Sequence, residues 1–118
     1  MQNNYKRFDV VMVDFGTNTI GSEQGCTRPA LIVQNNRGNF FSSCTIVIPF
    51  SHVLKGAHIP THTIIKKSKK NGLKVDSMLL GEQIRVISEK RITEKLGSVT
   101  DENEIKEIRR VYNANFGE

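Results

Sequence analysis

One stretch of the chain joins a polar loop directly to an apolar run: Gly21-Ser22-Glu23-Gln24-Gly25-Cys26-Thr27-Arg28-Pro29-Ala30-Leu31-Ile32-Val33-Gln34-Asn35-Asn36. The apolar residues after Pro29 predict a strand, so the loop before it is attached to a rigid element. Arg28 stands at the junction, and a residue that precedes proline is restricted to extended backbone conformations. The stretch therefore predicts a planar cation held at the mouth of a strand.

Two roles remain open for Arg28 on this pattern. A guanidinium carries five donors in a planar fork, which suits an anion such as a phosphodiester. The same group also pairs readily with a surface carboxylate. The stretch alone does not choose between these roles.

Two further strands are expected on either side of this stretch. Residues 8–15 are apolar almost without interruption, which indicates a strand buried on both faces or one that enters a barrel. Residues 44–51 read as another strand, and the internal Pro49 argues for an edge position or a place near the strand end. Ser51 then emerges at a strand mouth, as Arg28 does. Both side chains are therefore expected at one pocket.

The connections are expected to be loops and turns. The run Asn36-Arg37-Gly38-Asn39 holds residues that tolerate positive φ, which predicts a loop. Residues 52–60 read as a loop with some apolar content, and we expect it to pack on a partner subunit. Strand-like runs follow at residues 61–66, 77–80 and 83–87. Gly81, between the last two, indicates a bulge or a close backbone approach.

The chain ends in an amphipathic helix. Residues 88–91 suit a single helical turn, and residues 92–99 are ambiguous. Thr100 is the expected N-cap of a helix over residues 101–115. Its apolar face consists of Ile105, Ile108, Val111, Tyr112 and Phe116. Several short strands followed by one helix predict an α+β fold, with a small, strongly curved, barrel-like sheet of five to seven strands.

Composition limits the class of protein. With 118 residues, 37% hydrophobic and 25% charged, the chain suits one globular domain over residues 1–118, with residues 1–6 as a flexible tail. It has no apolar run of about 18 residues and no apolar segment behind its polar start, so a cytoplasmic protein is expected. Cys26 and Cys44 are expected to be ordinary thiols. No CxxC or HExxH spacing is present, so neither a metal site nor a Cys-His nucleophile is expected.

The net charge of +5 is concentrated in a lysine-rich tract. The tract contains Lys66, Lys67, Lys69, Lys70 and Lys74. Between the last two lies Asn71-Gly72, a pair that is typical of a turn. Such a tract suits a polyanion, and it equally suits a solubilising hairpin tip. The sequence leaves both interpretations open.

Four stretches together resemble one family. They are Arg7-Phe8-Asp9-Val10-Val11, the stretch from Gly21 to Asn35, Pro60-Thr61-His62 and Glu82-Gln83-Ile84-Arg85. In order and spacing, over about residues 6–116, the chain resembles the MazF/PemK (Kid) toxins of bacterial type II toxin-antitoxin systems, and most of all MazF endoribonucleases of Gram-positive bacteria.

The resemblance implies an SH3-like barrel with a C-terminal helix and a homodimer. It implies sequence-specific, metal-independent cleavage of single-stranded RNA, which leaves a 2′,3′-cyclic phosphate and a 5′-hydroxyl. It also implies a cognate MazE-like antitoxin whose disordered tail folds across the dimer and blocks the RNA groove. No cofactor is implied.

Carried over by position, the catalytic arginine of the family falls on Arg28 and its catalytic threonine on Ser51. Serine keeps the hydroxyl but lacks the methyl group that limits χ1, so its rotamer is less fixed. Two more departures are Phe8 and Cys26, which stand where the family usually has glycine. Cys26 is expected to reduce backbone freedom beside Arg28.

The chemistry of such a nuclease uses the 2′-hydroxyl of the RNA as nucleophile. Arg28 would stabilise charge on the phosphoryl oxygens, and Ser51 would donate to a non-bridging oxygen. The general base stays open between Glu23 and His62. Base reading would fall to polar residues around the groove: Ser22, Glu23, Gln24, Pro60, Thr61, His62, Ser77 and Gln83. The rival interpretation is a non-catalytic toxin on the same scaffold that binds a protein target such as DNA gyrase, as CcdB does.

Overall fold

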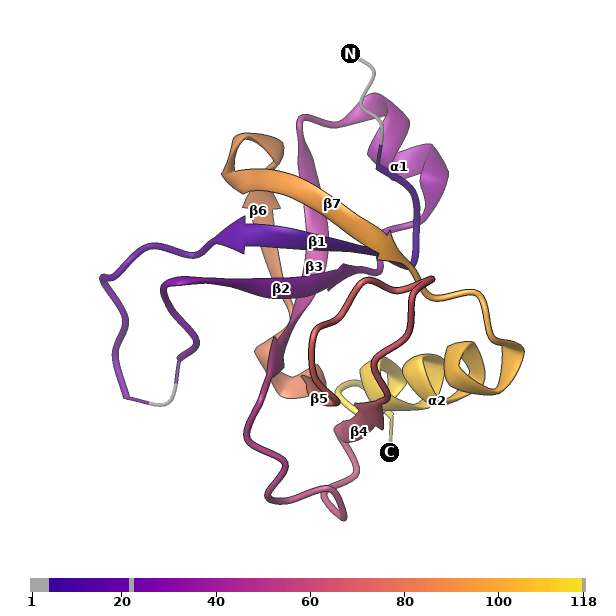
Figure 1. The fold of residues 1–118 in the computed structure, drawn as a ribbon. Helices are drawn as coiled ribbons and strands as arrows, with labels where there is room; N and C mark the ends of the chain where they lie inside the picture. The colour runs from indigo at the N-terminus through magenta and orange to yellow at the C-terminus, as the bar shows by residue number, and fades with distance from the viewer. Residues whose placement is uncertain (1–4, 22, 118) are drawn as a thin grey trace.

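The computed structural model describes residues 5–21 and 23–117, which form one curved antiparallel sheet covered at one end by a helix (Figure 1). The strands are β1 (Asp9–Asp14), β2 (Thr27–Ile32), β3 (Cys44–Ser51), β4 (His62–Ile65), β5 (Ser77–Leu80), β6 (Arg85–Ser88) and β7 (Ile92–Ser98). The helices are α1 (Asn36–Phe41) and α2 (Glu102–Asn113), with single 3₁₀ turns at Gly81–Gln83 and Glu89–Arg91. The predicted α+β class, with a small barrel-like sheet and a C-terminal helix, is confirmed.

Strand β3 occupies the middle of the sheet. The strand order is β4-β5-β3-β2-β1-β7, and β6 also pairs with β3. On one side β3 pairs with β2; on the other it pairs with β6 through Cys44–Val47 and with β5 through Phe50–Ser51. Pro49 lies between the residues of β3 that pair with β6 and those that pair with β5. On that side of β3, its lack of an N–H therefore costs no hydrogen bond to a neighbouring strand. The position near the strand end is confirmed, whereas the edge alternative is wrong.

The sheet buries apolar side chains on both faces. On β1, Val10 belongs to one cluster together with Ile108 and Val111 of α2. Val11 and Val13 point to a second cluster. The prediction that this strand is buried on both faces is therefore confirmed, and the continuous apolar run is explained.

The start of the chain is only partly described. Residues 1–4 of the expected tail lie outside the described residues. Tyr5 packs against the second cluster, and the N–H of Lys6 donates to Asp9 Oδ2 at 2.8 Å. These two residues belong to the folded part of the chain.

Helix α1 replaces the loop expected at residues 36–39. Asn35 is its N-cap, and the Asn35 side chain accepts from the N–H of Gly38 at 2.8 Å. The buried side chain of Asn39 accepts from the Thr45 hydroxyl at 2.7 Å and from Gln34 Nε2 at 3.0 Å. The loop prediction was wrong because asparagine is both a turn residue and a helix cap, and here Asn35 caps the helix while the Asn39 side chain holds it to its neighbours.

Helix α2 begins one residue later than expected. Its N-cap is Asp101, not Thr100, and the Asp101 carboxylate accepts from the N–H of Glu104 at 3.0 Å. Ile105, Ile108, Val111 and Tyr112 pack on the sheet as predicted. Phe116 lies beyond the helix and is exposed, so its place on the apolar face was wrong.

Candidate active site

Arg28 and Ser51 line one cavity. Its volume is about 260 Å³, and it lies where β2 begins and the neighbouring β3 ends. Thr27, Arg28 and Pro29 form one wall, Phe50, Ser51 and His52 a second, and Val75 and Ser77 the third. The predicted convergence of a guanidinium and a hydroxyl on one pocket is confirmed, and both residues are half-buried.

The backbone holds the guanidinium of Arg28 in place. Its Nε donates to the carbonyl of Gly25 at 2.9 Å, and its Nη1 lies 3.5 Å from the carbonyl of Phe50. Among the described residues, Arg28 forms no ion pair with a carboxylate, so the surface-pairing interpretation is not supported. A guanidinium has five N–H donors and these contacts use two. The group is therefore fixed in position with donors left for an anion.

The hydroxyl of Ser51 also helps to shape the chain behind it. Its Oγ accepts from the N–H of Val53 at 3.1 Å, which forms a tight turn at the end of β3. This turn directs His52 to the wall of the cavity. A hydroxyl that accepts one bond can still donate its own hydrogen. Ser51 can therefore donate to an oxygen bound beside Arg28.

The loop before Arg28 contains an unusual backbone conformation. Cys26 has φ of 62°, and Phe8 has φ of 74°. Both lie in the left-handed region that favours glycine. These are the two positions at which the sequence departs from the glycine of the family pattern, so the structure keeps the glycine-type backbone with a larger side chain in each place.

A second cavity is lined in part by the same loop. It measures about 480 Å³, and its lining includes Glu23, Gln83 and Arg85. The guanidinium of Arg85 lies 5.2 Å from the centre of the Phe15 ring. Glu23 Oε1 accepts from the N–H of Ile20 at 2.9 Å. Two of the predicted base-reading residues, Glu23 and Gln83, therefore meet in one polar hollow.

The remaining base-reading candidates are placed differently. Ser22 lies outside the described residues. Gln24 is half-buried and lines neither of these cavities. Ser77 is buried on the wall of the 260 Å³ cavity, and its hydroxyl donates to the carbonyl of Val75 at 2.9 Å.

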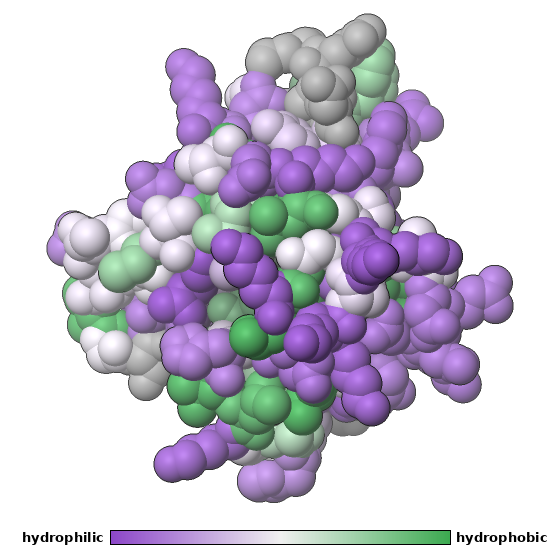
Figure 2. Space-filling view, viewed as in Figure 1, coloured by the Kyte–Doolittle hydropathy of each residue, from purple (hydrophilic) through white to green (hydrophobic). Residues whose placement is uncertain are grey.

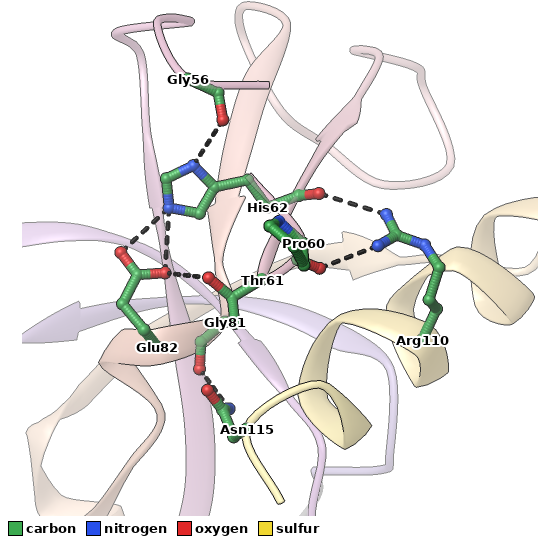
Figure 3. Close-up of polar contacts among 8 residues, drawn as sticks. All are labelled: Gly56, Pro60, Thr61, His62, Gly81, Glu82, Arg110 and Asn115. Carbon is green, nitrogen blue, oxygen red and sulfur yellow. Dashed lines mark hydrogen bonds and ion pairs between the residues drawn. The ribbon is translucent and has the colours of Figure 1, made fainter. Parts of the chain in front are cut away.

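Pro60, Thr61 and His62 take part in an internal network (Figure 3). His62 is 7% exposed, and its Nδ1 lies 2.9 Å from the carbonyl of Gly56. The hydroxyl of Thr61 donates to Glu82 at 3.0 Å, and Arg110 of α2 donates to the carbonyl of Pro60 at 2.8 Å. These polar groups are engaged within the fold, away from the cavity of Arg28.

The same network sets the ionisation of Glu82. Burial raises the pKa of its carboxyl, but the hydrogen bond from His62 and those from its own backbone N–H and from Thr61 outweigh that effect. The pKa of Glu82 is therefore below its ordinary value. Glu82 is thus an anion that joins the turn at Gly81–Gln83 to the start of β4.

Sequence reasoning missed two polar residues of the Arg28 cavity. Thr27 precedes Arg28, and His52 follows Ser51; both are exposed. The signal that could have found them is adjacency to the two residues expected at the strand mouths.

The lysine-rich tract lines a hollow on the surface. This cavity of about 910 Å³ has Lys66, Lys67, Lys69 and Lys70 on one side. Asp101, Glu102 and Glu104 at the start of α2 form the other. The tract therefore faces carboxylates across the hollow and is partly balanced by them.

Metal-binding and membrane-spanning features were also sought. Within residues 5–21 and 23–117, no three His, Cys, Asp or Glu side chains form a group suited to a metal ion. In the same part of the chain, no helix combines the length and the apolar character needed to cross a membrane.

Comparison with known proteins gives consistent relatives. The family described as "PemK-like, MazF-like toxin of type II toxin-antitoxin system" matches residues 6–115. Endoribonuclease EndoA of Bacillus subtilis (strain 168) is 42% identical over 97 residues, which make up 82% of each chain.

Solved structures share the fold. MazF (Form-I) from Deinococcus radiodurans superposes with a TM-score of 0.77 at 22% identity and covers 97% of each chain. A mycobacterial endoribonuclease, solved in complex with its cognate antitoxin, superposes with a TM-score of 0.75 at 20% identity and covers 93% of this chain and 92% of that one. Since the family match covers almost the whole chain and spans all three walls of the Arg28 cavity, this protein belongs to the PemK-like, MazF-like toxins of type II toxin-antitoxin systems.

Proposed function

We propose that this toxin is a sequence-specific endoribonuclease that cleaves single-stranded RNA by attack of the 2′-hydroxyl on the adjacent phosphorus. The observation that carries the proposal is the cavity shared by Arg28 and Ser51, built from the ends of two paired strands. The 42% identity to an endoribonuclease of Bacillus subtilis supports the same reaction class.

The nucleophile is already tethered beside the phosphorus, so the protein has to position the linkage and stabilise charge. Arg28, fixed by two backbone carbonyls, supplies a permanent positive charge to the phosphoryl oxygens. Ser51 donates its hydroxyl hydrogen to a non-bridging oxygen. The products are a 2′,3′-cyclic phosphate and a 5′-hydroxyl, and no step needs a metal ion.

Base recognition falls to the polar residues of the two cavities beside the cleavage position. Glu23 and Gln83 in the second cavity have the acceptors and donors that read the edges of splayed bases. Ser77 lies in the first cavity. Ser22 and Gln24 belong to the same loop as Glu23 and complete the proposed set.

The proposed assembly is a homodimer that is inhibited by a cognate MazE-like antitoxin. The loop after β3 supports the proposal of a dimer, because its apolar side chains Val53, Leu54 and Ile59 are each at least 40% exposed and could be covered by a second subunit. Figure 2 shows apolar surface on the lower part of this face, where that loop runs. The mycobacterial endoribonuclease that was solved in complex with its cognate antitoxin supports the proposal of an antitoxin partner.

The gyrase-directed alternative is not favoured. The relatives reported above are named as endoribonucleases or as MazF. A toxin that only binds a protein has no need for a guanidinium and a hydroxyl in one cavity of about 260 Å³.

The test is cleavage of a long defined RNA by the purified protein, with both new ends mapped. We expect cuts at one short sequence, unchanged by EDTA, with a cyclic phosphate on the 5′ fragment. A substrate with a single 2′-deoxy nucleotide at the scissile position is expected to resist cleavage. Cutting of that deoxy substrate would exclude the proposed nucleophile.

A further inference from the structure

His52 occupies the wall of the Arg28 cavity beside the proposed cleavage position. It directly follows Ser51, and the turn closed by the Val53 N–H and Ser51 Oγ keeps both residues at the cavity. The imidazole is exposed, so substrate and solvent can reach it. No role was expected for this residue from the sequence.

The two residues that sequence reasoning offered as general base are both placed elsewhere. His62 is 7% exposed, and its two ring nitrogens lie 2.9 Å from Gly56 O and 2.9 Å from Glu82 Oε2. Glu23 accepts the N–H of Ile20 and lines the second cavity. Neither residue lines the cavity of Arg28 and Ser51.

The walls of this cavity contain few charged groups. From β2, Arg28 faces the cavity; from β3 and the segment that leads into β5, the lining side chains are neutral. Asp76 lies between Val75 and Ser77, but its Oδ1 accepts from the N–H of Lys67 at 2.9 Å and it does not line the cavity. Among the described residues that form these walls, His52 is the one side chain whose type can take up a proton near neutral pH.

We propose that His52 is the general base of the RNA cleavage, an inference that rests on the proposed function. An unprotonated ring nitrogen of His52 takes the proton of the 2′-hydroxyl. The 2′-oxygen forms a bond to phosphorus, the bond from phosphorus to the 5′-oxygen breaks, and that oxygen takes a proton from water. The imidazolium then returns its proton to solvent. Arg28 stabilises the charge throughout and never has to lose a proton, for which its guanidinium is too basic.

The test compares His52→Gln with His58→Gln. His58 lies in the same loop, is also exposed and lines none of the described cavities near Arg28, so it is a matched control. The measurement is the single-turnover cleavage rate of a short RNA that contains the mapped cleavage site, over a range of pH. Thermal melting of each variant checks folding.

We expect His52→Gln to lose about 10²- to 10⁴-fold in rate, which is the usual contribution of general acid-base catalysis. The parent rate should fall on acidification, because a protonated imidazole cannot take the proton of the 2′-hydroxyl, and the variant should lose that dependence. Binding of a 2′-deoxy substrate analogue should stay at the parent affinity. Added imidazole should restore part of the rate of His52→Ala. His58→Gln should behave as the parent.

Two results would overturn the inference: a parent rate and pH profile in folded His52→Gln, or a loss that appears only in substrate affinity. Arg28→Ala separates this failure from failure of the proposed function. If Arg28→Ala is inactive while His52→Gln is unaffected, only the role of His52 fails. If the parent protein cleaves the 2′-deoxy substrate, the proposed function fails as well.

Discussion

Nε2 of His62 lies 2.9 Å from both carboxylate oxygens of Glu82, twenty residues further along the chain. Together with the bond between His62 Nδ1 and Gly56 O, this pair links the loop after β3 to the turn after β5 (Figure 3). Both partners of the ring are acceptors, so both bonds form only when both ring nitrogens carry a proton. Two of the stretches that resemble the toxin family thus meet in a contact that shapes the loop following Ser51.

Acidification is expected to weaken this link through Glu82. Its folded pKa is below the ordinary value of 4.5, so the carboxylate stabilises the fold above that value. The contribution is lost as pH falls through the folded pKa. Glu82→Gln should therefore show a smaller fall in melting temperature than the parent between about pH 6 and pH 3.

Glu104 is the matched control for this prediction. Burial, helped by the charge of Asp101, raises its pKa, so the folded state favours the protonated carboxyl. Its effect has the opposite sign: stability is lost as pH rises through this range. Glu104→Gln should therefore steepen the acid-side fall in melting temperature, and equal slopes in all three proteins would contradict both assignments.

Gly81→Ala is expected to destabilise the protein, although Gly81 does not line the Arg28 cavity. A Cβ at this position would lie 2.5 Å from the carbonyl oxygen of Thr61 and would overlap Cγ1 of Val111. One neighbour is backbone and cannot rotate away, so we expect a loss of at least about 1–3 kcal/mol in the free energy of unfolding. Urea denaturation measures this loss in the free energy of unfolding. Gly21→Ala is the contrasting case, because an added Cβ there meets no atom within 4 Å but φ is positive, whereas Gly81 has a clash and no positive φ.

Arg28 and Ser51 are expected to respond differently to conservative changes. Arg28→Ala should lose about 10²- to 10³-fold in cleavage rate, as removal of an oxyanion donor does. Arg28→Lys should recover only part of this, because an ammonium lacks the fork that contacts Gly25 O and Phe50 O. The measurement is single-turnover cleavage with melting curves as a folding control.

Ser51→Thr should cleave at least as fast as the parent. The added methyl restricts χ1 and keeps the hydroxyl. Ser51→Ala should be slower, because it removes both the proposed donor and the acceptor of the Val53 N–H. A threonine variant slower than the alanine variant would contradict the assigned role.

The sequence was most informative where a pattern is local. The apolar run from Cys44 to Ser51 predicted β3 with its observed bounds, and the three- and four-residue spacing predicted the packed face of α2. Arg28 and Ser51 could be assigned to strand mouths because proline and the apolar runs mark those mouths.

The features that sequence reasoning missed depend on specific contacts that follow no periodic pattern. Helix α1 is held by Asn39, whose side chain accepts from Gln34 Nε2 and from the hydroxyl of Thr45 on β3. His52 lines the Arg28 cavity because a turn follows Ser51 and because the segment with Val75 and Ser77 supplies another wall. No local pattern encodes such a meeting of β3 with β5.

Substitution by glycine is expected to change the free energy of unfolding in opposite directions at Cys26 and Phe8, the two residues with left-handed backbone. Cys26 and Phe8 have φ of 62° and 74°, a conformation that costs a side chain about 1–2 kcal/mol. Glycine removes this cost but adds about 0.5–1 kcal/mol of chain entropy to be lost on folding. The side chain of Cys26 is exposed, so Cys26→Gly should raise the free energy of unfolding slightly.

Phe8 differs because its side chain is used. Its ring packs against the main core cluster, and the guanidinium groups of Arg7 and Arg109 lie 5.0 Å and 5.8 Å from its centre. Phe8→Gly removes this packing, and loss of a packed phenylalanine costs about 3–5 kcal/mol when it is fully buried. Even for a half-buried ring, the free energy lost with the packing exceeds that gained by relieving the backbone strain, so this variant should be less stable than the parent. Urea denaturation of both variants decides the matter: destabilisation by Cys26→Gly, or stabilisation by Phe8→Gly, would contradict the balance of strain and packing assigned to that position.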